Sequence, residues 1–259
     1  MNLIDNIVAQ AAAMTAIRRD IHAHPETCFE EHRTSELVAT LLTEWGIEVH
    51  RGLGKTGVVG LIRGRDGGQS GRSLGLRADM DALPMQELNS FAHASKTPGK
   101  MHACGHDGHT TMLLAAAQHL ARQRDFDGTV VLIFQPAEEL GGGAHAMIED
   151  GLFERFPVDA VFGTHNWPGM AVGDIALSSG PVMASTNEFK IVIQGRGCHG
   201  AMPHMGIDPV PVACQVVQGF QTIISRNKKP IDSAVLSVTM IHAGEATNVV
   251  PDHCEIQGT

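Results

Sequence analysis

The sequence predicts an α/β fold, with a doubly wound, mainly parallel sheet followed by a smaller α+β domain. Short apolar runs such as residues 130–134 alternate with segments of helical period, which is typical of parallel strands buried on both faces. Beyond Ser-Ser-Gly-Pro at residues 178–181, this alternation gives way to a strand, a Gly- and His-rich loop, a helix and two more strands. We therefore expect a larger domain over residues 1–180 and a smaller domain over residues 181–259.

The larger domain is predicted to open with helices over residues 5–20 and 33–45. The second carries apolar residues at helical spacing and ends at Gly46. Strands over residues 58–62 and 73–77 flank a Gly-rich polar loop, and we expect them to pair with each other. The remaining predicted elements are a helix over 110–120, a strand over 130–134, a helix over 143–150 and a strand over 158–162.

The smaller domain is predicted to contain a strand over 188–194, a helix over 210–226, and strands over 233–242 and 253–259. The last strand is still running at residue 259, and no closing element follows it. We therefore expect the chain to be a fragment of a longer protein.

Composition excludes several classes of protein. The 259 residues carry a formal net charge of −9 and no block of Lys or Arg, so nucleic acid is not an expected partner. No run approaches the roughly 20 apolar residues that a membrane helix needs, and the N-terminus lacks the pattern of a secretory signal. Five scattered cysteines argue against a disulfide framework and indicate a reducing, cytoplasmic setting.

The densest chemistry lies in the segment His-Ala-Cys-Gly-His-Asp-Gly-His at residues 102–109. Cys104 and His106 are two residues apart, and thiolate and neutral imidazole are both good ligands for zinc-like ions. Taken alone, Cys104 could be a buried structural cysteine. Because the cluster is too dense for all its members to bind one ion, His102, Asp107 and His109 are expected to orient the ligands.

Further acidic and imidazole groups follow predicted strands, where open α/β sheets bind ligands. In the pair Glu138-Glu139, one carboxylate is expected to bind metal while its neighbour takes a proton from water; a solvated loop is the alternative. His165 follows the strand over 158–162 and is predicted to be a ligand. Asp79 and Asp81 are predicted to support the ligands rather than bind metal, with helix or turn caps as the alternative. The pattern favours a metallohydrolase.

These residues also stand in recognisable motifs, and the chain resembles the metal-dependent aminoacylase and carboxypeptidase family. It is most similar to the branch of hippurate hydrolases, N-acyl-amino-acid amidohydrolases and plant auxin-conjugate hydrolases. The matching stretches are residues 18–26 (RRDIHAHPE), 76–87 (LRADMDALPMQE), 101–110 (MHACGHDGHT), 134–139 (FQPAEE), 165–168 (HNWP), 197–209 (GCHGAMPHMGIDP) and 246–252 (ATNVVPD).

The resemblance implies a catalytic domain like that of di-metal exopeptidases, with an inserted lid and dimerisation domain. It implies two divalent ions (zinc, manganese, cobalt or nickel) that Cys104 bridges, with His106, Glu139 and His165 as further ligands. Glu138 matches the general base. In the lid, His199 matches a residue that steadies the oxyanion in the partner's site, and Asn248 matches a residue associated with substrate binding.

The implied activity is hydrolysis of the amide bond of N-acyl amino acids to a carboxylic acid and a free amino acid. A homodimer or higher homo-oligomer is implied through the lid. A dipeptidase or carboxypeptidase with the same site is the near alternative. The family's members continue past the position of residue 259 and supply one more metal-binding histidine, so a catalytically defective fragment that binds metal and dimerises is the other alternative.

Overall fold

The computed structural model describes residues 3–259, and it does not describe the side chains of residues 3, 4 and 66. The chain divides into two compact units, Met1–Met170 and Ala171–Thr259. Between the last strand of the first unit and the first strand of the second, residues 164–188 form neither helix nor strand. The predicted domain boundary at residue 180 falls inside this segment.

The first unit is built on a five-stranded sheet. Its strand order is β1-β2-β4-β3-β5, in which the strands are β1 (Glu48–Leu53), β2 (Gly57–Arg63), β4 (Thr129–Gln135), β3 (Ser73–Asp79) and β5 (Ala160–Gly163). The predicted α/β class is confirmed, but the prediction of a mainly parallel sheet was wrong. β3 pairs in parallel with β4 and β5, whereas β2 pairs antiparallel with both β1 and β4. A strand buried on both faces has the same apolar run in either direction, so its pattern could not predict this.

The two strands that were predicted to pair with each other, β2 and β3, are separated by β4. Val131 of β4 lies opposite Leu61 on one side and opposite Gly75 on the other. The loop between β2 and β3, which includes the 3₁₀ turn η1 (Arg65–Gly67), passes the end of β4. A polar Gly-rich loop indicates that the chain changes direction, but it does not exclude that a strand from later in the sequence lies between the two strands that the loop connects.

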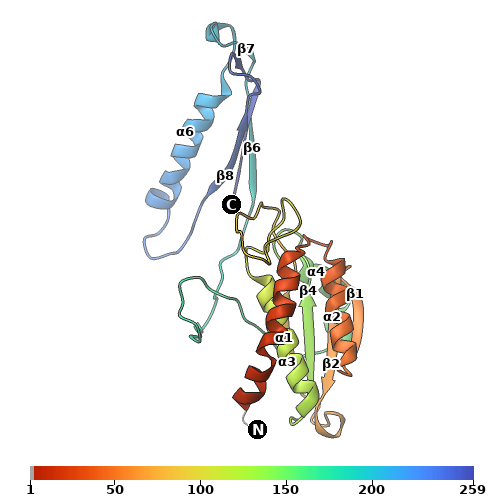
Figure 1. Ribbon diagram of the computed structural model, residues 1–259. Helices are drawn as coiled ribbons and strands as arrows, with labels where there is room; N and C mark the ends of the chain where they lie inside the picture. The colour runs from red at the N-terminus through yellow and green to blue at the C-terminus, as the bar shows by residue number, and fades with distance from the viewer. Residues whose placement is uncertain (1–2) are drawn as a thin grey trace. The chain divides into compact units, whose positions relative to one another are not determined.

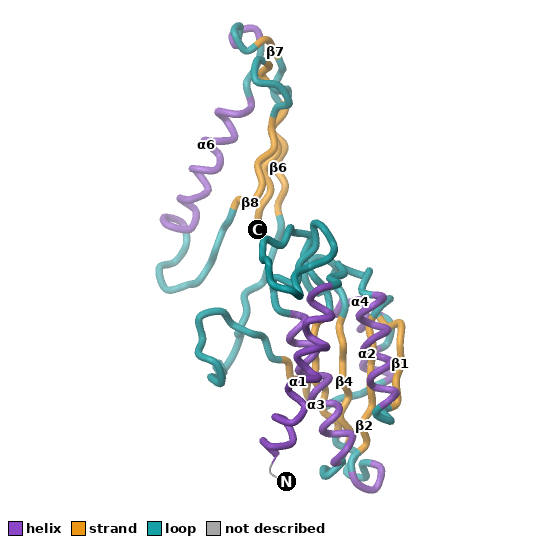
Figure 2. Tube along the Cα trace, viewed as in Figure 1, coloured by secondary structure: helices purple, strands orange, loops and turns teal. Residues whose placement is uncertain are grey.

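Helices cover both faces of this sheet (Figures 1 and 2). On one face lie α1 (Leu3–Ala23), α2 (His32–Glu44) and α3 (His106–Gln123), and on the other lie α4 (Gly143–Glu149) and α5 (Leu152–Arg155). Alternate residues of β4 enter the two cores. Leu132 and Phe134 pack with α2 and α3, and Val131 and Ile133 pack with α4 and α5. The presence of helices on both faces of the sheet is therefore as predicted.

β5, which corresponds to the strand predicted over residues 158–162, lies at one edge of the sheet that the described residues form. All four of its residues are exposed, and it pairs only with β3 among the described strands. Phe162 alone is 59% exposed. The apolar run therefore predicted this strand correctly.

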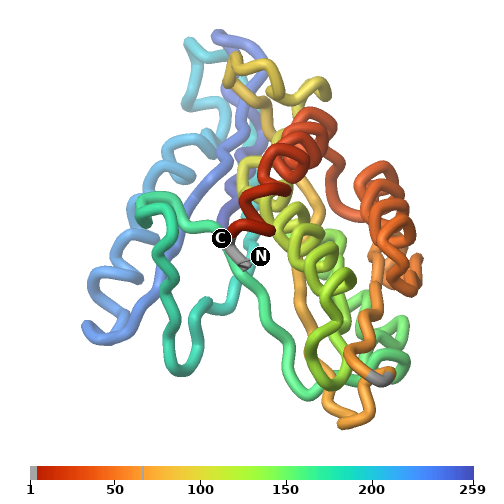
Figure 3. The backbone as a smooth tube through the Cα atoms, turned by 60° about the horizontal axis from the view of Figure 1, so that its bottom comes forward, coloured from red at the N-terminus to blue at the C-terminus, as the bar shows by residue number. Residues whose placement is uncertain are grey.

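The second unit contains an antiparallel sheet of β6 (Phe189–Gln194), β10 (His253–Gly258) and β8 (Val238–Ala243), in that order. α6 (Pro209–Thr222) runs beside this sheet (Figure 3) and packs Ala213 against Cys254 and Ile256. Asp208 caps α6 by accepting a hydrogen bond from the Val210 N–H, and Pro209 occupies the first turn, where no N–H is needed.

Four short elements complete the described part of this unit. They are the 3₁₀ turn η2 (Pro203–Met205), the π-helical turn η3 (Ile223–Asn227), and the two-residue strands β7 (Cys198–His199) and β9 (Val249–Val250), which pair antiparallel. Nowhere in residues 3–259 is a helix long and apolar enough to cross a membrane.

Candidate metal centre

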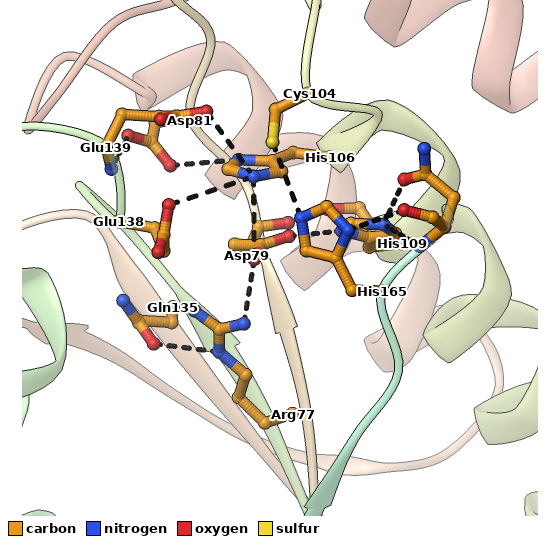
Figure 4. Close-up of polar contacts among 12 residues, drawn as sticks. Arg77, Asp79, Asp81, Cys104, His106, His109, Gln135, Glu138, Glu139 and His165 are labelled. Carbon is orange, nitrogen blue, oxygen red and sulfur yellow. Dashed lines mark hydrogen bonds and ion pairs between the residues drawn. The ribbon is translucent and has the colours of Figure 1, made fainter. Parts of the chain in front are cut away.

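The site forms at the carboxyl ends of β3, β4 and β5, where the parallel register brings their ends together. Asp79 at the end of β3 lies opposite Gln135 at the end of β4. Asp81 follows β3, the pair Glu138-Glu139 follows β4, and His165 follows β5. α3 begins at His106 and adds that ring to the cluster (Figure 4). Sheets of this kind bind ligands at this edge.

Potential ligand atoms gather around one imidazole. Cys104, His106 and His165 form one group whose ligand atoms lie within 4.8 Å of one another, and His106, Glu138 and Glu139 form a second; a third consists of Asp79, His106 and His109. His106 belongs to all three. The structure thus brings together Cys104, His106, Glu138, Glu139 and His165, with Asp79 and Asp81 beside them.

Two buried polar atoms in this cluster lack a hydrogen-bond partner within the described chain. They are Nε2 of His106 and Oε1 of Glu139, which lie 3.7 Å apart, and Oε2 of Glu138 is 4.0 Å from the same nitrogen. An unpaired buried nitrogen or carboxylate oxygen is costly. A cation between these atoms would satisfy both, so the residues fit a divalent metal ion.

The histidine tautomers suit the same purpose. The Nδ1 of His106 lies 3.2 Å from Oδ1 of Asp81, and the Nδ1 of His165 lies 2.7 Å from the carbonyl oxygen of Asn166. Both oxygens can only accept, so each Nδ1 carries the proton and each Nε2 presents a lone pair. The Nε2 of His165 is 3.4 Å from Sγ of Cys104.

A hydrogen-bonded chain fixes the loop that carries His165. Arg77 donates to Asp79 at 2.7 Å, Asp79 accepts from Nδ1 of His109 at 2.7 Å, and Nε2 of His109 accepts from the Asn166 backbone N–H at 3.0 Å. The side-chain amide of Asn166 lies against Gly105, where a Cβ atom would come within 2.2 Å of Oδ1. Gly105 has φ of +89°, so both its conformation and the lack of space require glycine.

The carboxylates set the charge of the site. Burial alone would raise the pKa of Asp79, but the hydrogen bond from His109 and the charge of Arg77 outweigh it and hold that pKa at about 2. Burial, together with the negative charges of Glu139, Asp79 and Glu138, raises the pKa of the Cys104 thiol to about 12. Cysteine nucleophiles have lowered pKa values. The raised pKa of Cys104 therefore suits a metal ligand, which is deprotonated when a cation binds, better than it suits a nucleophile.

Asp107 was predicted to support the ligands, but its side chain faces α1. Oδ2 of Asp107 accepts from Nε of Arg18 at 3.1 Å and lies 3.1 Å from Nδ1 of His22, whose Nε2 is 3.1 Å from Oε1 of Glu87. This network ties α1, the loop after β3 and the start of α3 together behind the metal centre. His22 and Glu87 lie within the motifs, but their pairing spans 65 residues and has no local sequence signal.

We expect Asp107→Asn to destabilise the chain near neutral pH. Burial would raise the pKa of Asp107, but the His22 hydrogen bond and the charges of His102 and Arg18 hold it at about 2. An unfolded Asp has a pKa of about 3.9. The folded pKa is the lower one, so the stabilisation of about 2 kcal/mol is present above pH ~4 and is lost as pH falls through about 2.

Urea unfolding at a series of pH values measures this effect. The difference in unfolding free energy between the native chain and Asp107→Asn should be full at pH 6 and should shrink steadily below pH 4. A difference that stays constant over that range would contradict the assignment.

His199 and Asn248, the two predicted lid residues, lie in the second unit. The β7–β9 pairing places His199 opposite Val249, and the Gly200 N–H donates to the Asn248 carbonyl at 2.7 Å. Both side chains are exposed. Nδ1 of His199 accepts from the Ala201 N–H at 3.0 Å, so its Nε2 carries the proton.

Comparison with known proteins gives close relatives. The chain is 48% identical over 257 residues to a hippurate hydrolase of Campylobacter jejuni (99% of this chain, 66% of the relative), and 44% identical to an N-acetyl-L-cysteine deacetylase of Bacillus subtilis (98% and 60%). It is 46% identical to an N-acyl-L-amino acid amidohydrolase of Geobacillus stearothermophilus (99% and 68%). The chain thus spans about two thirds of the length of these relatives.

A solved structure has the same fold. It is that of a dinuclear metal-binding peptidase of Bacillus subtilis, which is 40% identical in sequence and has a TM-score of 0.70. The match covers 96% of this chain and 64% of the peptidase chain. The model of Peptidase family M20/M25/M40 matches residues 75–256, which include every residue of the cluster. The chain therefore belongs to Peptidase family M20/M25/M40.

Proposed function

We propose that this chain is the metal-binding part of an amidohydrolase that cleaves N-acyl amino acids to a carboxylic acid and a free amino acid. The observation that carries the proposal is the unpaired Nε2 of His106, which faces the Glu138-Glu139 pair while Cys104 and His165 lie alongside. Membership of the family and the names of the relatives, a hippurate hydrolase and an N-acyl-L-amino acid amidohydrolase, support the substrate class.

We assign the metal ligands to Cys104, His106, Glu139 and His165, which would hold two divalent ions (zinc, manganese, cobalt or nickel). Bound ions of this kind lower the pKa of a coordinated water and polarise the scissile carbonyl. The protein residues provide the orientation. Asp81 holds His106 in the tautomer with a free Nε2, and His109 holds the loop of His165 through Asn166.

Glu138 is proposed as the general base. Its side chain is 43% exposed, whereas that of Glu139 is 19% exposed. The more exposed carboxylate can reach a substrate, take a proton from the attacking water and deliver it to the nitrogen of the leaving amine. The less exposed carboxylate, which has a buried unpaired oxygen, is the better ligand.

The second unit is proposed to act as the lid and dimerisation domain. A protonated Nε2 on exposed His199 can donate a hydrogen bond to an oxyanion that develops only in the transition state. Asn248, whose carbonyl accepts from Gly200 beside His199, is proposed to bind substrate. We infer a homodimer or higher homo-oligomer in which a partner's lid completes the site.

A carboxypeptidase activity is the second candidate. The chain is 46% identical over 247 residues to a thermostable carboxypeptidase of Saccharolobus solfataricus. We propose the same ligands and base for both activities, so only the preferred substrate separates them.

The test is hydrolysis of benzoyl-, acetyl- and indoleacetyl-amino acids and of dipeptides, with added metal and with chelator. Chelator-sensitive turnover that is faster on acyl amino acids supports the amidohydrolase, and faster turnover on dipeptides supports the peptidase. Metal binding without turnover on any substrate would favour the third reading, a metal-binding fragment that is catalytically inactive.

A further inference from the structure

One buried carboxylate outside the metal centre is tied to the turn that carries Glu138 and Glu139. Glu31 is 0% exposed. Its Oε1 accepts from the Ala137 N–H at 2.9 Å and from the Phe29 N–H at 3.0 Å, and its Oε2 accepts from the Thr56 hydroxyl at 2.5 Å. Ala137 directly precedes Glu138, so a residue 106 positions away holds the start of the catalytic turn.

Both backbone N–H groups that share Oε1 come from strained residues. Phe29 has φ of +60° and Ala137 has φ of +51°, the left-handed region that non-glycine residues rarely adopt. Such conformations persist only where the surroundings hold them, and they cluster at functional sites. A single carboxylate oxygen holds both residues here.

The side chain of Glu31 does not cap the helix that it precedes, α2. It occupies the N-cap position of α2, yet its carboxylate makes no capping hydrogen bond, and Glu26 accepts from the N–H groups of Arg33 and Thr34 instead. Burial raises the pKa of Glu31, so the burial of this carboxylate is unfavourable, and it makes no capping bond to α2 that would offset this. The hydrogen bonds to Ala137, Phe29 and Thr56 are therefore the favourable interactions that hold it here.

The rest of the turn is fixed around Ala137. Its carbonyl accepts from the Gly143 N–H at 2.9 Å, and the Glu139 N–H donates to Asp81 at 3.0 Å. Gly141 has no room for a side chain, since a Cβ there would lie 2.1 Å from Sγ of Cys28 and 2.8 Å from Cβ of Ala137. Glu31 thus binds the backbone at Ala137, and Asp81 binds it two residues later, at Glu139.

We propose that Glu31 is a positioning residue that holds Ala137 in its left-handed conformation and so sets where the carboxylates of Glu138 and Glu139 lie. The inference rests on the proposed function, because it takes Glu138 as the base and Glu139 as a ligand. The contact itself does not depend on that function.

The test compares three variants with the native chain. Glu31→Leu removes both acceptor oxygens. Glu31→Gln is the conservative change, because its amide oxygen can still accept from Ala137 and Phe29 while its NH₂ donates to Thr56. Thr56→Val is the matched control, because it removes the contact to Oε2 and leaves the contact to Ala137.

Three quantities are measured: amide hydrogen exchange of residues 136–142, affinity for Co²⁺, and kcat and KM on an acyl amino acid. For Glu31→Leu we expect at least ~10-fold faster exchange, a loss of about 10–100-fold in Co²⁺ affinity, and a fall in kcat larger than any rise in KM. Glu31→Gln should recover most of each, and Thr56→Val should leave exchange of the turn nearly native.

The proposal is overturned if Glu31→Leu folds and leaves exchange of the turn native, or if Thr56→Val loosens the turn as much as Glu31→Leu does. If Glu31→Leu does not fold, the other two variants decide. Faster exchange of the turn in Thr56→Val than in Glu31→Gln overturns the proposal, because the contact to Oε2 would then matter more than the contact to Ala137. Exchange in Thr56→Val that is as slow as in Glu31→Gln or slower supports it. A native chain that neither binds Co²⁺ nor turns over would refute the proposed function, while the exchange data would still test the contact.

Discussion

Glu138→Gln should abolish turnover while leaving metal uptake intact. The substitution keeps the size of the side chain but removes the group that accepts the proton from water, and general-base catalysis typically contributes 10²–10⁴-fold. Because the less exposed Glu139 is the assigned ligand, the variant should bind Co²⁺ with nearly native affinity. We therefore expect kcat to fall at least ~1000-fold, as measured on the preferred acyl amino acid.

Glu149→Gln is the control for this substitution. Glu149 lies in α4, is largely exposed and pairs with His145 one turn earlier, so its amide variant should keep native kcat. If Glu138→Gln retained more than a tenth of native turnover, the base would have to be another residue. A loss of Co²⁺ binding in the same variant would instead move Glu138 into the ligand set.

Cys104→Ala should remove most of the metal affinity and, with it, the activity. The Cys104 thiol lies in the group with His106 and His165, and neighbouring carboxylates disfavour its thiolate unless a cation is present. Changes to residues that merely orient ligands cost about 10–100-fold in affinity, so loss of a ligand should cost more than ~100-fold. Titration with Co²⁺ measures this directly, because a thiolate ligand gives a sulfur-to-cobalt charge-transfer band in the near ultraviolet.

Cys214→Ala provides the matched control. Cys214 is exposed on α6 in the second unit, so its removal should leave the band and the affinity unchanged. If the band persisted in Cys104→Ala, Cys104 would not bind the metal. If both variants lost it equally, the effect would come from general damage to the fold.

Most of the helices and strands and the grouping of the candidate ligands could be predicted from the sequence, because each rests on a short local pattern. Cys104, His106 and the Glu138-Glu139 pair are unusual residue types in dense motifs, and the ends of parallel strands predicted where they would meet. The direction of β2 could not be predicted, since an apolar run indicates that a strand is buried but not which strands lie beside it or in which direction they run.

The residues that hold the candidate ligands in place were harder to predict than the candidate ligands. Glu31 has an ordinary acidic residue, Glu30, beside it, and only the fold distinguishes them: Glu30 pairs with Lys100 at the surface, whereas Glu31 is buried against Ala137. His109 lies in a motif and was expected to orient a ligand, but its partner Asn166 is 57 residues away. Contacts between residues this far apart in the sequence depend on the topology of the fold, which a local sequence pattern does not indicate.

The insertion of β4 between β2 and β3 also constrains how the chain reaches its native state. While the polypeptide is being synthesised, β2 and β3 emerge well before residues 129–135 and have unpaired edges toward the gap that β4 later fills. Open strand edges can pair wrongly with each other or with another chain. The inner edges of β2 and β3 therefore cannot both gain their native partner before residues 129–135 have been synthesised.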